Sequence, residues 1–262
     1  TRHEIVVTTT ISRRPHKPLL RALRSGGASI EAFDDHSGQG FIVRGWQQMP
    51  DALSVDPRES SQYASALAML AVGADQPFTL RLLDTPVSES YLEMTLAMLE
   101  EAGVETIRHG DLIAFNQTER LREKLSLEIE LDASSRAVWS VARFLGHPIV
   151  PGRKVRIPRQ PDSAVDTCLS RLRDAVRGEV EMDLGEVPDL LPVLAVAAAA
   201  QRHPVTFQGV AHLRNKESNR LDEFAQSLRN VGLTADVLDD GLRMHPLTAL
   251  QPEQFFHTHG DH

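Results

Sequence analysis

The sequence predicts an α/β protein with two domains, built from repeated strand-helix-strand-helix-strand-strand modules. One observation is a pattern of helix, glycine, strand, turn and strand that occurs three times along the 262 residues. Another is that the segments 64–72 and 190–200 carry few polar residues, so their helices are expected to lie inside a shell of strands. A supersecondary unit that recurs in this way indicates a repeat architecture.

The first copy of the pattern occupies residues 5–44. A short β-branched run at 5–9 predicts a strand, and Arg14-Pro15 then opens a helix that ends at Gly26-Gly27. Two strands are expected after these glycines, at 28–33 and 40–44.

The second and third copies follow the same order. In the second copy a helix ends at Gly103 and leads to a strand pair at 104–115, and in the third a helix ends at Gly232 and leads to a strand pair at 233–244. The remaining elements are helices expected at 60–72, 134–145, 163–177 and 188–201, and short strands at 78–82 and 205–208.

The division between domains is predicted where the chain becomes polar. Residues 116–124 are rich in charge and precede a predicted strand at 127–131. We therefore place the boundary at residue 130, which gives domains 1–130 and 131–262.

Composition narrows the class of function. The chain is 41% hydrophobic and 24% charged, as in an ordinary soluble globular protein. A formal net charge of −8 argues against a general nucleic-acid or anionic-membrane surface, so an anion site would have to be made by local cations. The single Cys168 excludes an internal disulfide framework and is compatible with a reducing cytoplasm, where we expect a buried structural thiol. No apolar run approaches the roughly 18 residues of a membrane span, and Thr1 opens no signal peptide.

The segment 213–220 predicts the first turns of a helix. The residues that follow it form one apolar stripe at positions i, i+3, i+4 and i+7, namely Leu221, Phe224, Ala225 and Leu228. Lys216 and Arg220 would then share a different face. A helix N-terminus prefers acids, so two cations there call for an anion such as phosphate or carboxylate. Glu217 is a candidate acid or base, and the alternative is a solvated helix start with a Glu217–Arg220 ion pair.

Other predicted helix starts carry polar groups suited to small anions. Ser60, Ser61 and Gln62 place neutral donors beside free backbone N–H groups, although simple capping by the serines is the alternative. Ser88 is expected at a helix cap with Tyr91 one turn on, a combination suited to a polar ring. Asp189 would cap a buried helix without needing a function, and Arg14 is one more cation at a helix start.

Taken together, these segments resemble a known family. In chain order they are Ser-Ser-Gln-Tyr at 60–63, Ser88 with Tyr91, Asp-Ala-Ser-Ser at 132–135, Pro188-Asp189, and Arg-x-Lys-Glu-Ser-x-Arg at 214–220. Their order and spacing resemble those of the 3-phosphoshikimate 1-carboxyvinyltransferases, or EPSP synthases, over nearly the whole chain. The Ser-Ser-Gln and Lys-Glu-x-x-Arg blocks are the specific part of this resemblance.

The resemblance implies the enolpyruvyl transferase prism, an inside-out α/β barrel with two domains of βαβαββ repeats. Residues 1–130 would be a substrate-binding prism domain without its N-terminal repeat, and 131–262 a second prism domain without its C-terminal end. The implied reaction transfers the enolpyruvyl group of phosphoenolpyruvate to the 5-hydroxyl of shikimate 3-phosphate through a tetrahedral intermediate, with loss of phosphate. It is a step of the shikimate pathway, the target of glyphosate, and needs no metal or cofactor. We expect a cytoplasmic monomer whose partners are these two anions.

The resemblance also implies residue roles. Asp189 would accept the proton of the acceptor hydroxyl, and Lys216 with Glu217 would handle protons at the enolpyruvyl carbon and the leaving phosphate. The expected shikimate 3-phosphate ligands are Ser60, Ser61, Gln62, Ser88, Tyr91, Asp189 and Lys216. The expected phosphoenolpyruvate ligands are Arg14, Gln62 and Arg220.

Several positions depart from the family pattern. The early Lys-Ser motif and the Asn-x-Gly-Thr loop have no counterpart, and Gly260-Asp261-His262 resembles the start of an Asp-His-Arg motif whose Arg and a later Lys are absent. Glu89-Ser90 replaces the usual Lys-Pro, and Asn215 replaces an apolar residue. Asn219 replaces the acid that usually precedes Arg220, and the loss of that acid would hold the Arg220 side chain less firmly. Our hypothesis is that the chain is an internal fragment, catalytically incomplete alone.

Three other readings are kept. The sister enzyme acting on UDP-N-acetylglucosamine shares the fold and the reaction, and a non-catalytic module would bind shikimate 3-phosphate without turnover. A metal site at His257, His259, Asp261 and His262 has spacing that ligands can use, although a frayed His-rich end is the commoner explanation.

Overall fold

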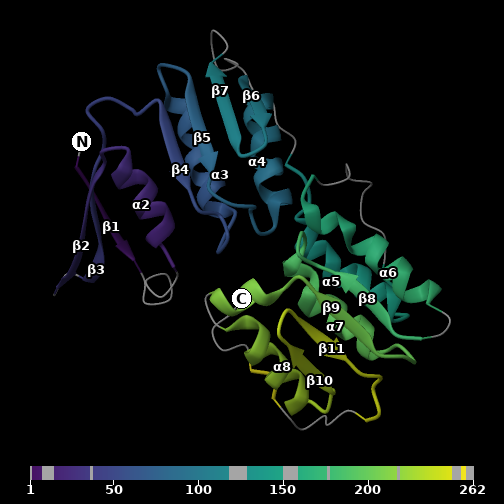
Figure 1. Cartoon of the computed structure of the whole chain (residues 1–262). Helices are drawn as coiled ribbons and strands as arrows, with labels where there is room; N and C mark the ends of the chain where they lie inside the picture. The colour runs from purple at the N-terminus through teal and green to yellow at the C-terminus, as the bar shows by residue number, and fades with distance from the viewer. Residues whose placement is uncertain are drawn as a thin grey trace. The chain divides into compact units, whose positions relative to one another are not determined.

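The computed structural model describes residues 2–7, 15–35, 38–117, 129–149, 159–175, 178–216, 219–249 and 255–257 (Figure 1). The chain divides into two compact units, Thr1–Ser126 and Leu127–His262. The boundary predicted at residue 130 lies near this division, and the assignment of the two domains as partial prisms stays a prediction.

A four-stranded sheet forms the centre of the first unit. Its strands, in spatial order, are β4 (Ala52–Val55), β5 (Phe78–Leu82), β7 (Leu112–Gln117) and β6 (Val104–His109). β4 and β5 are parallel, and the other neighbours are antiparallel. The helix α3 (Gln62–Ala68), extended by the 3-10 turn η1 (Met69–Gly73), connects β4 to β5, and α4 (Glu89–Ala102) connects β5 to β6. This is one complete βαβαββ module, as predicted.

A three-stranded sheet begins the first unit and repeats the second half of that module. The strands β1 (Arg2–Val7), β3 (Gly38–Arg44) and β2 (Ser29–Asp35) are antiparallel and lie in that order. The helix α2 (Lys17–Ser25) links β1 to β2. The order β1-β3-β2 matches β5-β7-β6, so the first predicted copy of the pattern is confirmed.

The second unit contains another complete module. The strands β8 (Val180–Asp183), β9 (Val205–Gln208), β11 (Gly241–Met244) and β10 (Ala235–Leu238) repeat the order and directions of the first unit's four strands. The connections are η3 (Pro188–Leu190) with α7 (Leu191–Ala199), and η4 (Ala211–Asn215) with α8 (Arg220–Asn230). Before β8 come α5 (Ala133–Phe144), η2 (Pro161–Ala164) and α6 (Val165–Asp174).

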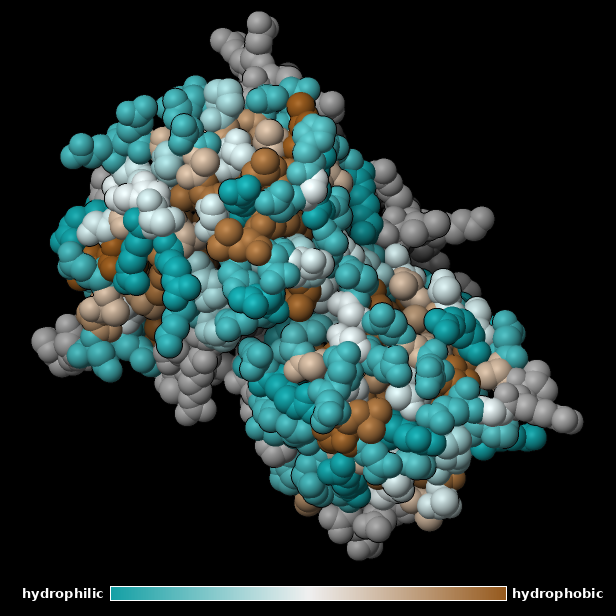
Figure 2. All heavy atoms as spheres, viewed as in Figure 1, coloured by the Kyte–Doolittle hydropathy of each residue, from teal (hydrophilic) through white to brown (hydrophobic). Residues whose placement is uncertain are grey.

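The hydrophobic core of each unit includes most of its apolar helix. In the second unit α7 buries most of its residues, among them Leu191, Leu194 and Ala198. In the first unit α3 buries Ala64, Leu67 and Ala68, but Met69 is 56% exposed because the chain tightens into η1 there. The expectation of an inside helix is therefore confirmed for α7 and for α3, and only in part for η1, where Ala71 is buried but Met69 and Val72 are exposed. Figure 2 shows hydrophilic residues over most of the visible surface, with smaller apolar patches among them.

Two further predictions can be compared with the described residues. Residues 129–131 form no strand, and the rest of the strand predicted at 127–131 lies outside the described residues. Along α8 the predicted stripe is confirmed, since Leu221, Ala225 and Leu228 are buried and Phe224 packs against the same core. In the described segments we find no helix with the length and apolar character needed to span a membrane.

Candidate functional site

The first unit gathers its predicted ligand residues at one edge of its four-stranded sheet. The strands β4 and β5 are parallel, so α3 and α4 begin at the same edge. Backbone hydrogen bonds join the two strand-to-helix connections, from Leu83 N to Val55 O at 2.8 Å and from Val87 N to Pro57 O at 3.5 Å. The structure therefore brings Ser60 and its neighbours towards the segment that carries Ser88.

Polar groups crowd the start of α3. Ser60 Oγ accepts a hydrogen bond from Gln62 N at 3.2 Å, while Ser61 is buried and its side chain makes no capping hydrogen bond. Simple capping therefore accounts for Ser60 and does not account for Ser61. The Tyr63 hydroxyl donates to the carbonyl of Pro15, which follows Arg14 in the chain. Arg14 itself lies outside the described residues.

Ser88 adopts a backbone conformation that serines rarely use. Its φ of 50° and ψ of 54° are left-handed, and it is the one non-glycine residue with positive φ in the described part of the chain. Ser88 is the N-cap residue of α4, as predicted, but its side chain is buried and makes no capping hydrogen bond. A left-handed non-glycine residue costs about 1–3 kcal/mol, and such strain concentrates at functional sites. Tyr91 follows within the first turn, and its N–H donates to Ser88 O at 3.2 Å.

In the second unit the motif 214–220 is not the start of one helix. η4 ends at Asn215, Lys216 has extended backbone, and α8 begins at Arg220. Asn219 caps α8, because its side-chain oxygen accepts the N–H of Asp222 at 3.4 Å. Lys216 and Arg220 therefore do not share a helical face, and that prediction is wrong. Glu217, and with it the alternative Glu217–Arg220 pair, lies outside the described residues.

Asp189 and Arg220 form an ion pair across the two connections of the second module. Arg220 Nη1 donates to Asp189 Oδ1 at 2.9 Å, although the residues are 31 positions apart in the chain. The Arg220 side chain is only 18% exposed. Asp189 lies in η3 ahead of α7 and caps neither helix, so its predicted capping role is wrong; its carboxylate contacts the start of α8 instead. The structure thus unites the predicted proton acceptor and a predicted anion ligand.

His212 is a member of this group that the sequence reasoning missed. Burial lowers the pKa of its imidazole, and the positive charge of Lys216 lowers it further, while Asp189, Asp240 and Glu186 act in the opposite direction. The ring therefore lies within the electrostatic influence of both Lys216 and Asp189. Its place in the chain shortly before Lys216 was the available signal.

Metal and thiol chemistry find little support in the described segments. They contain no group of three or more His, Cys, Asp or Glu side chains arranged to hold a metal ion. Of the residues in the alternative terminal metal site, only His257 is described. Cys168 is partly buried, and burial raises the pKa of its thiol, which makes it a weak nucleophile.

The pattern of the whole sequence decides the family. The family described as EPSP synthase (3-phosphoshikimate 1-carboxyvinyltransferase) matches residues 8–159 and 163–262. The chain belongs to this family. The resemblance found in the five motifs is thereby confirmed.

Curated relatives carry the family name. A 3-phosphoshikimate 1-carboxyvinyltransferase of Syntrophobacter fumaroxidans (strain DSM 10017 / MPOB) is 32% identical over 275 residues, covering 96% of this chain and 63% of the relative. One from Yersinia pestis bv. Antiqua (strain Angola) is 29% identical, covering 93% of this chain and 60% of the relative. The chain thus spans less than two thirds of the length of these EPSP synthases.

Solved structures share the fold. EPSP synthase from Acinetobacter baumannii has a TM-score of 0.64 and 19% identity, covering 95% of this chain and 60% of that one. The enolpyruvyl transferase NikO from Streptomyces tendae has a TM-score of 0.61 and 15% identity, covering 93% and 60%. The predicted enolpyruvyl transferase fold class is confirmed.

Proposed function

We propose that this chain serves the transfer of the enolpyruvyl group from phosphoenolpyruvate to the 5-hydroxyl of shikimate 3-phosphate, with release of phosphate. Membership of the EPSP synthase family across residues 8–159 and 163–262 is the observation that carries the proposal. The convergence of Asp189 and Arg220 supports it from the structure, because the reaction requires a proton acceptor close to a cation.

The acceptor substrate is assigned to the first unit. Ser60, Ser61, Gln62 and Ser88 supply hydroxyl and amide donors near the starts of α3 and α4, where backbone N–H groups favour a phosphate. Tyr91 is assigned to the face of the shikimate ring. The buried Ser61 hydroxyl and the strained backbone of Ser88 support this assignment.

The proton transfers are assigned to the second unit. Asp189 accepts the proton of the 5-hydroxyl, and Lys216 with Glu217 serves the enolpyruvyl carbon and the departing phosphate. Arg220, with Arg14 and Gln62, holds phosphoenolpyruvate. In the structure the Asp189 carboxylate is paired with the Arg220 guanidinium. An incoming phosphoenolpyruvate anion would replace Asp189 as the partner of Arg220 and leave the carboxylate ready to accept a proton.

The cellular setting is part of the same proposal. We assign the chain to the cytoplasm, with the two small anions as its partners and a single copy as the working state. Sedimentation of the protein with and without both substrates tests the last point, and a substrate-dependent dimer would contradict it.

The test combines turnover with binding. Phosphate release is followed in the presence of both substrates, and calorimetry measures the binding of shikimate 3-phosphate alone. Turnover with shikimate 3-phosphate supports the transferase. Turnover with UDP-N-acetylglucosamine instead would identify the sister activity. Tight binding of shikimate 3-phosphate with no turnover, even after the family segments that lack a counterpart here are supplied, would favour the non-catalytic module.

A further inference from the structure

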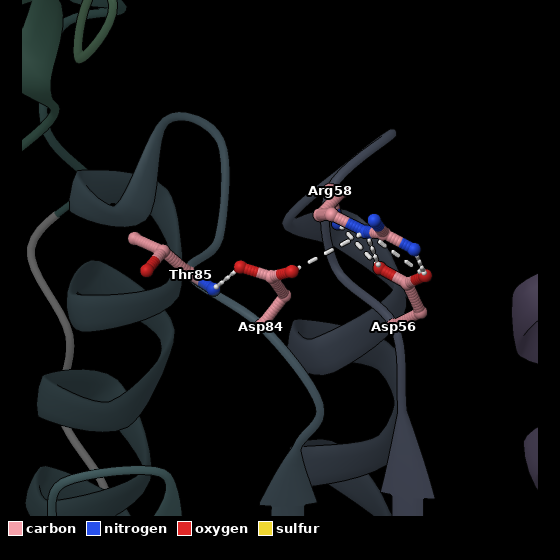
Figure 3. Close-up of polar contacts among 4 residues, drawn as sticks. All are labelled: Asp56, Arg58, Asp84 and Thr85. Carbon is pink, nitrogen blue, oxygen red and sulfur yellow. Dashed lines mark hydrogen bonds and ion pairs between the residues drawn. The ribbon is translucent and has the colours of Figure 1, made fainter.

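Arg58 links the two connections that carry the proposed ligands of the first unit. Its Nε lies 3.0 Å from Asp56 Oδ1, and its Nη2 donates to Asp56 Oδ2 at 2.6 Å. The same Nε lies 3.6 Å from Asp84 Oδ2. Figure 3 shows the guanidinium between the two carboxylates. Asp56 and Arg58 belong to the connection after β4, and Asp84 belongs to the connection after β5.

Both carboxylates are fixed to the backbone near them. Asp84 Oδ1 accepts the N–H of Thr85 at 2.8 Å, and Asp56 Oδ1 accepts the N–H of Arg58 at 3.1 Å (Figure 3). The hydrogen bond from the Arg58 side chain is the largest cause that holds the pKa of Asp56 below its usual value, while burial partly opposes it. The guanidinium is hydrogen-bonded to Asp56 on its own connection and forms a longer ion pair with Asp84 on the other, and this ion pair favours a short distance between the two segments.

Asp56, Arg58 and Asp84 lie just before the residues that are proposed to bind shikimate 3-phosphate. Arg58 is followed closely by Ser60 and Ser61, and Asp84 is followed by Ser88. Two backbone hydrogen bonds already join the two connections, from Leu83 N to Val55 O at 2.8 Å and, farther along, from Val87 N to Pro57 O at 3.5 Å. The side-chain bridge adds a contact between the same two connections.

We infer that Arg58 is a positioning residue, whose contacts with Asp56 and Asp84 set the spacing of the two segments that bind shikimate 3-phosphate. The inference rests on the proposed function. Substrate affinity and rate are sensitive to misplacement of binding groups by about 1 Å, so a tether at this point acts on affinity. Its contribution to global stability is small, because the Arg58 side chain is 64% exposed and exposed ion pairs are weak.

The first unit offers a matched control. Arg81 Nε pairs with Asp111 Oδ2 at 3.1 Å, and both side chains are 56% exposed. This pair links β5 to the turn between β6 and β7 and does not bridge the two connections. Arg81→Gln therefore removes the same charge and a similar ion pair without loosening the proposed ligand segments.

The experiment compares Arg58→Gln, Asp84→Asn, their double variant, Arg58→Lys and the control Arg81→Gln. Calorimetry gives the Kd for shikimate 3-phosphate, thermal unfolding gives stability, and hydrogen exchange reports the segments 56–61 and 83–88. We expect Arg58→Gln and Asp84→Asn each to raise the Kd about two- to fivefold. The double variant should exceed neither single variant, because both remove one bridge. Arg58→Lys should recover part of the affinity.

The backbone amide hydrogens of segments 56–61 and 83–88 should exchange faster in Arg58→Gln than in the parent chain. The melting temperature of Arg58→Gln should equal that of Arg81→Gln. A Kd and exchange rates equal to those of Arg81→Gln would overturn the inference. If the parent chain fails to bind shikimate 3-phosphate, the proposed function fails, and the exchange rates alone decide whether Arg58 holds the two segments together.

Discussion

The two complete modules of this chain share a backbone plan and differ in how they place charge on it. In the first, the cation Arg58 follows β4 and meets the acid Asp84, which follows β5. In the second the signs are exchanged, since the acid Asp189 follows β8 and the cation Arg220 begins α8 after β9. Each ion pair bridges the two strand-to-helix connections of its own module, and these connections correspond between the modules. The two modules thus have a bridge at corresponding places, and the sequence decides which connection carries the carboxylate.

Burial separates the two bridges further. The Arg220 side chain is 18% exposed, whereas that of Arg58 is 64% exposed. The two carboxylates differ much less, since Asp189 is 43% exposed and Asp84 49%, so the bridges differ mainly in the burial of their cations. In the first module the groups proposed to meet substrate are neutral hydroxyls and an amide. Under the proposed function, one module would hold the phosphorylated ring and the other would move a proton.

The sharpest test of this division is Asp189→Asn. The change keeps the size of the side chain and removes the proton acceptor, so phosphate release should fall by about a hundredfold or more. The melting temperature of the variant measures how much Asp189 contributes to stability. Unchanged phosphate release with a loss of stability would show that Asp189 only anchors Arg220, and the two bridges would then be equivalent.

Replacement of Arg220 should separate the two substrates. Arg220→Gln removes a charge-assisted contact, so the KM for phosphoenolpyruvate should rise about tenfold or more, with a smaller change for shikimate 3-phosphate. Steady-state kinetics measures both constants. Arg229→Gln, near the end of the same helix, is the control for loss of charge on α8. Equal effects on both substrates would contradict the assignment of Arg220 to phosphoenolpyruvate.

A backbone feature of the second module gives a third test. Gly209 has a φ of 77°, and a Cβ there would lie 2.4 Å from Asp183 Oδ1 and 2.8 Å from Gly185 N. Gly209→Ala should therefore lower the free energy of unfolding by about 1–3 kcal/mol, measured by urea denaturation. Gly178→Ala is the control, because Gly178 has a φ of 92° with nothing within 4 Å. A loss no larger than that of Gly178→Ala would show that the two connections need no close approach.

The smallest expected effect concerns pH. The pKa of His212 is lowered from 6.5 in the folded protein, so the unfolded chain binds its proton more readily. The free energy of unfolding should therefore be fully retained above that value and decrease as the pH falls below it. His212→Gln should reduce this decrease in urea titrations. An identical pH dependence would show that burial, assisted by the charge of Lys216, does not lower the pKa of His212 as described.

Local patterns predicted much of the fold. Glycine after an apolar helix, followed by two strands and a turn, predicted the ends of α2, α4 and α8 and the strand pairs beyond them. These signals are local, because the left-handed backbone of Gly103 ends α4 whatever the rest of the chain does. Helix extents were less accurate, since η1 tightens after Ala68 and Asn219 starts a new helix within a motif that reads as continuous.

The sequence predicted which residues belong to the candidate site, but it did not predict which of them contact one another. Asp189 has the local sequence of a cap, and its bond to a residue 31 positions away depends on the parallel pairing of β8 and β9. The left-handed backbone of Ser88 and the bridge from Arg58 to Asp84 likewise depend on how two connections meet. His212 was missed because its only sequence signal was its closeness to Lys216, and its burial and charged neighbours appear only in the fold.

The most direct measurement is phosphate release by the 262-residue chain when shikimate 3-phosphate and phosphoenolpyruvate are supplied together, with calorimetric binding of shikimate 3-phosphate alone beside it. The account predicts saturable binding of shikimate 3-phosphate; phosphate release that depends on both substrates would show that the chain is active alone, contrary to the hypothesis that it is catalytically incomplete. Absence of binding together with absence of release would contradict it.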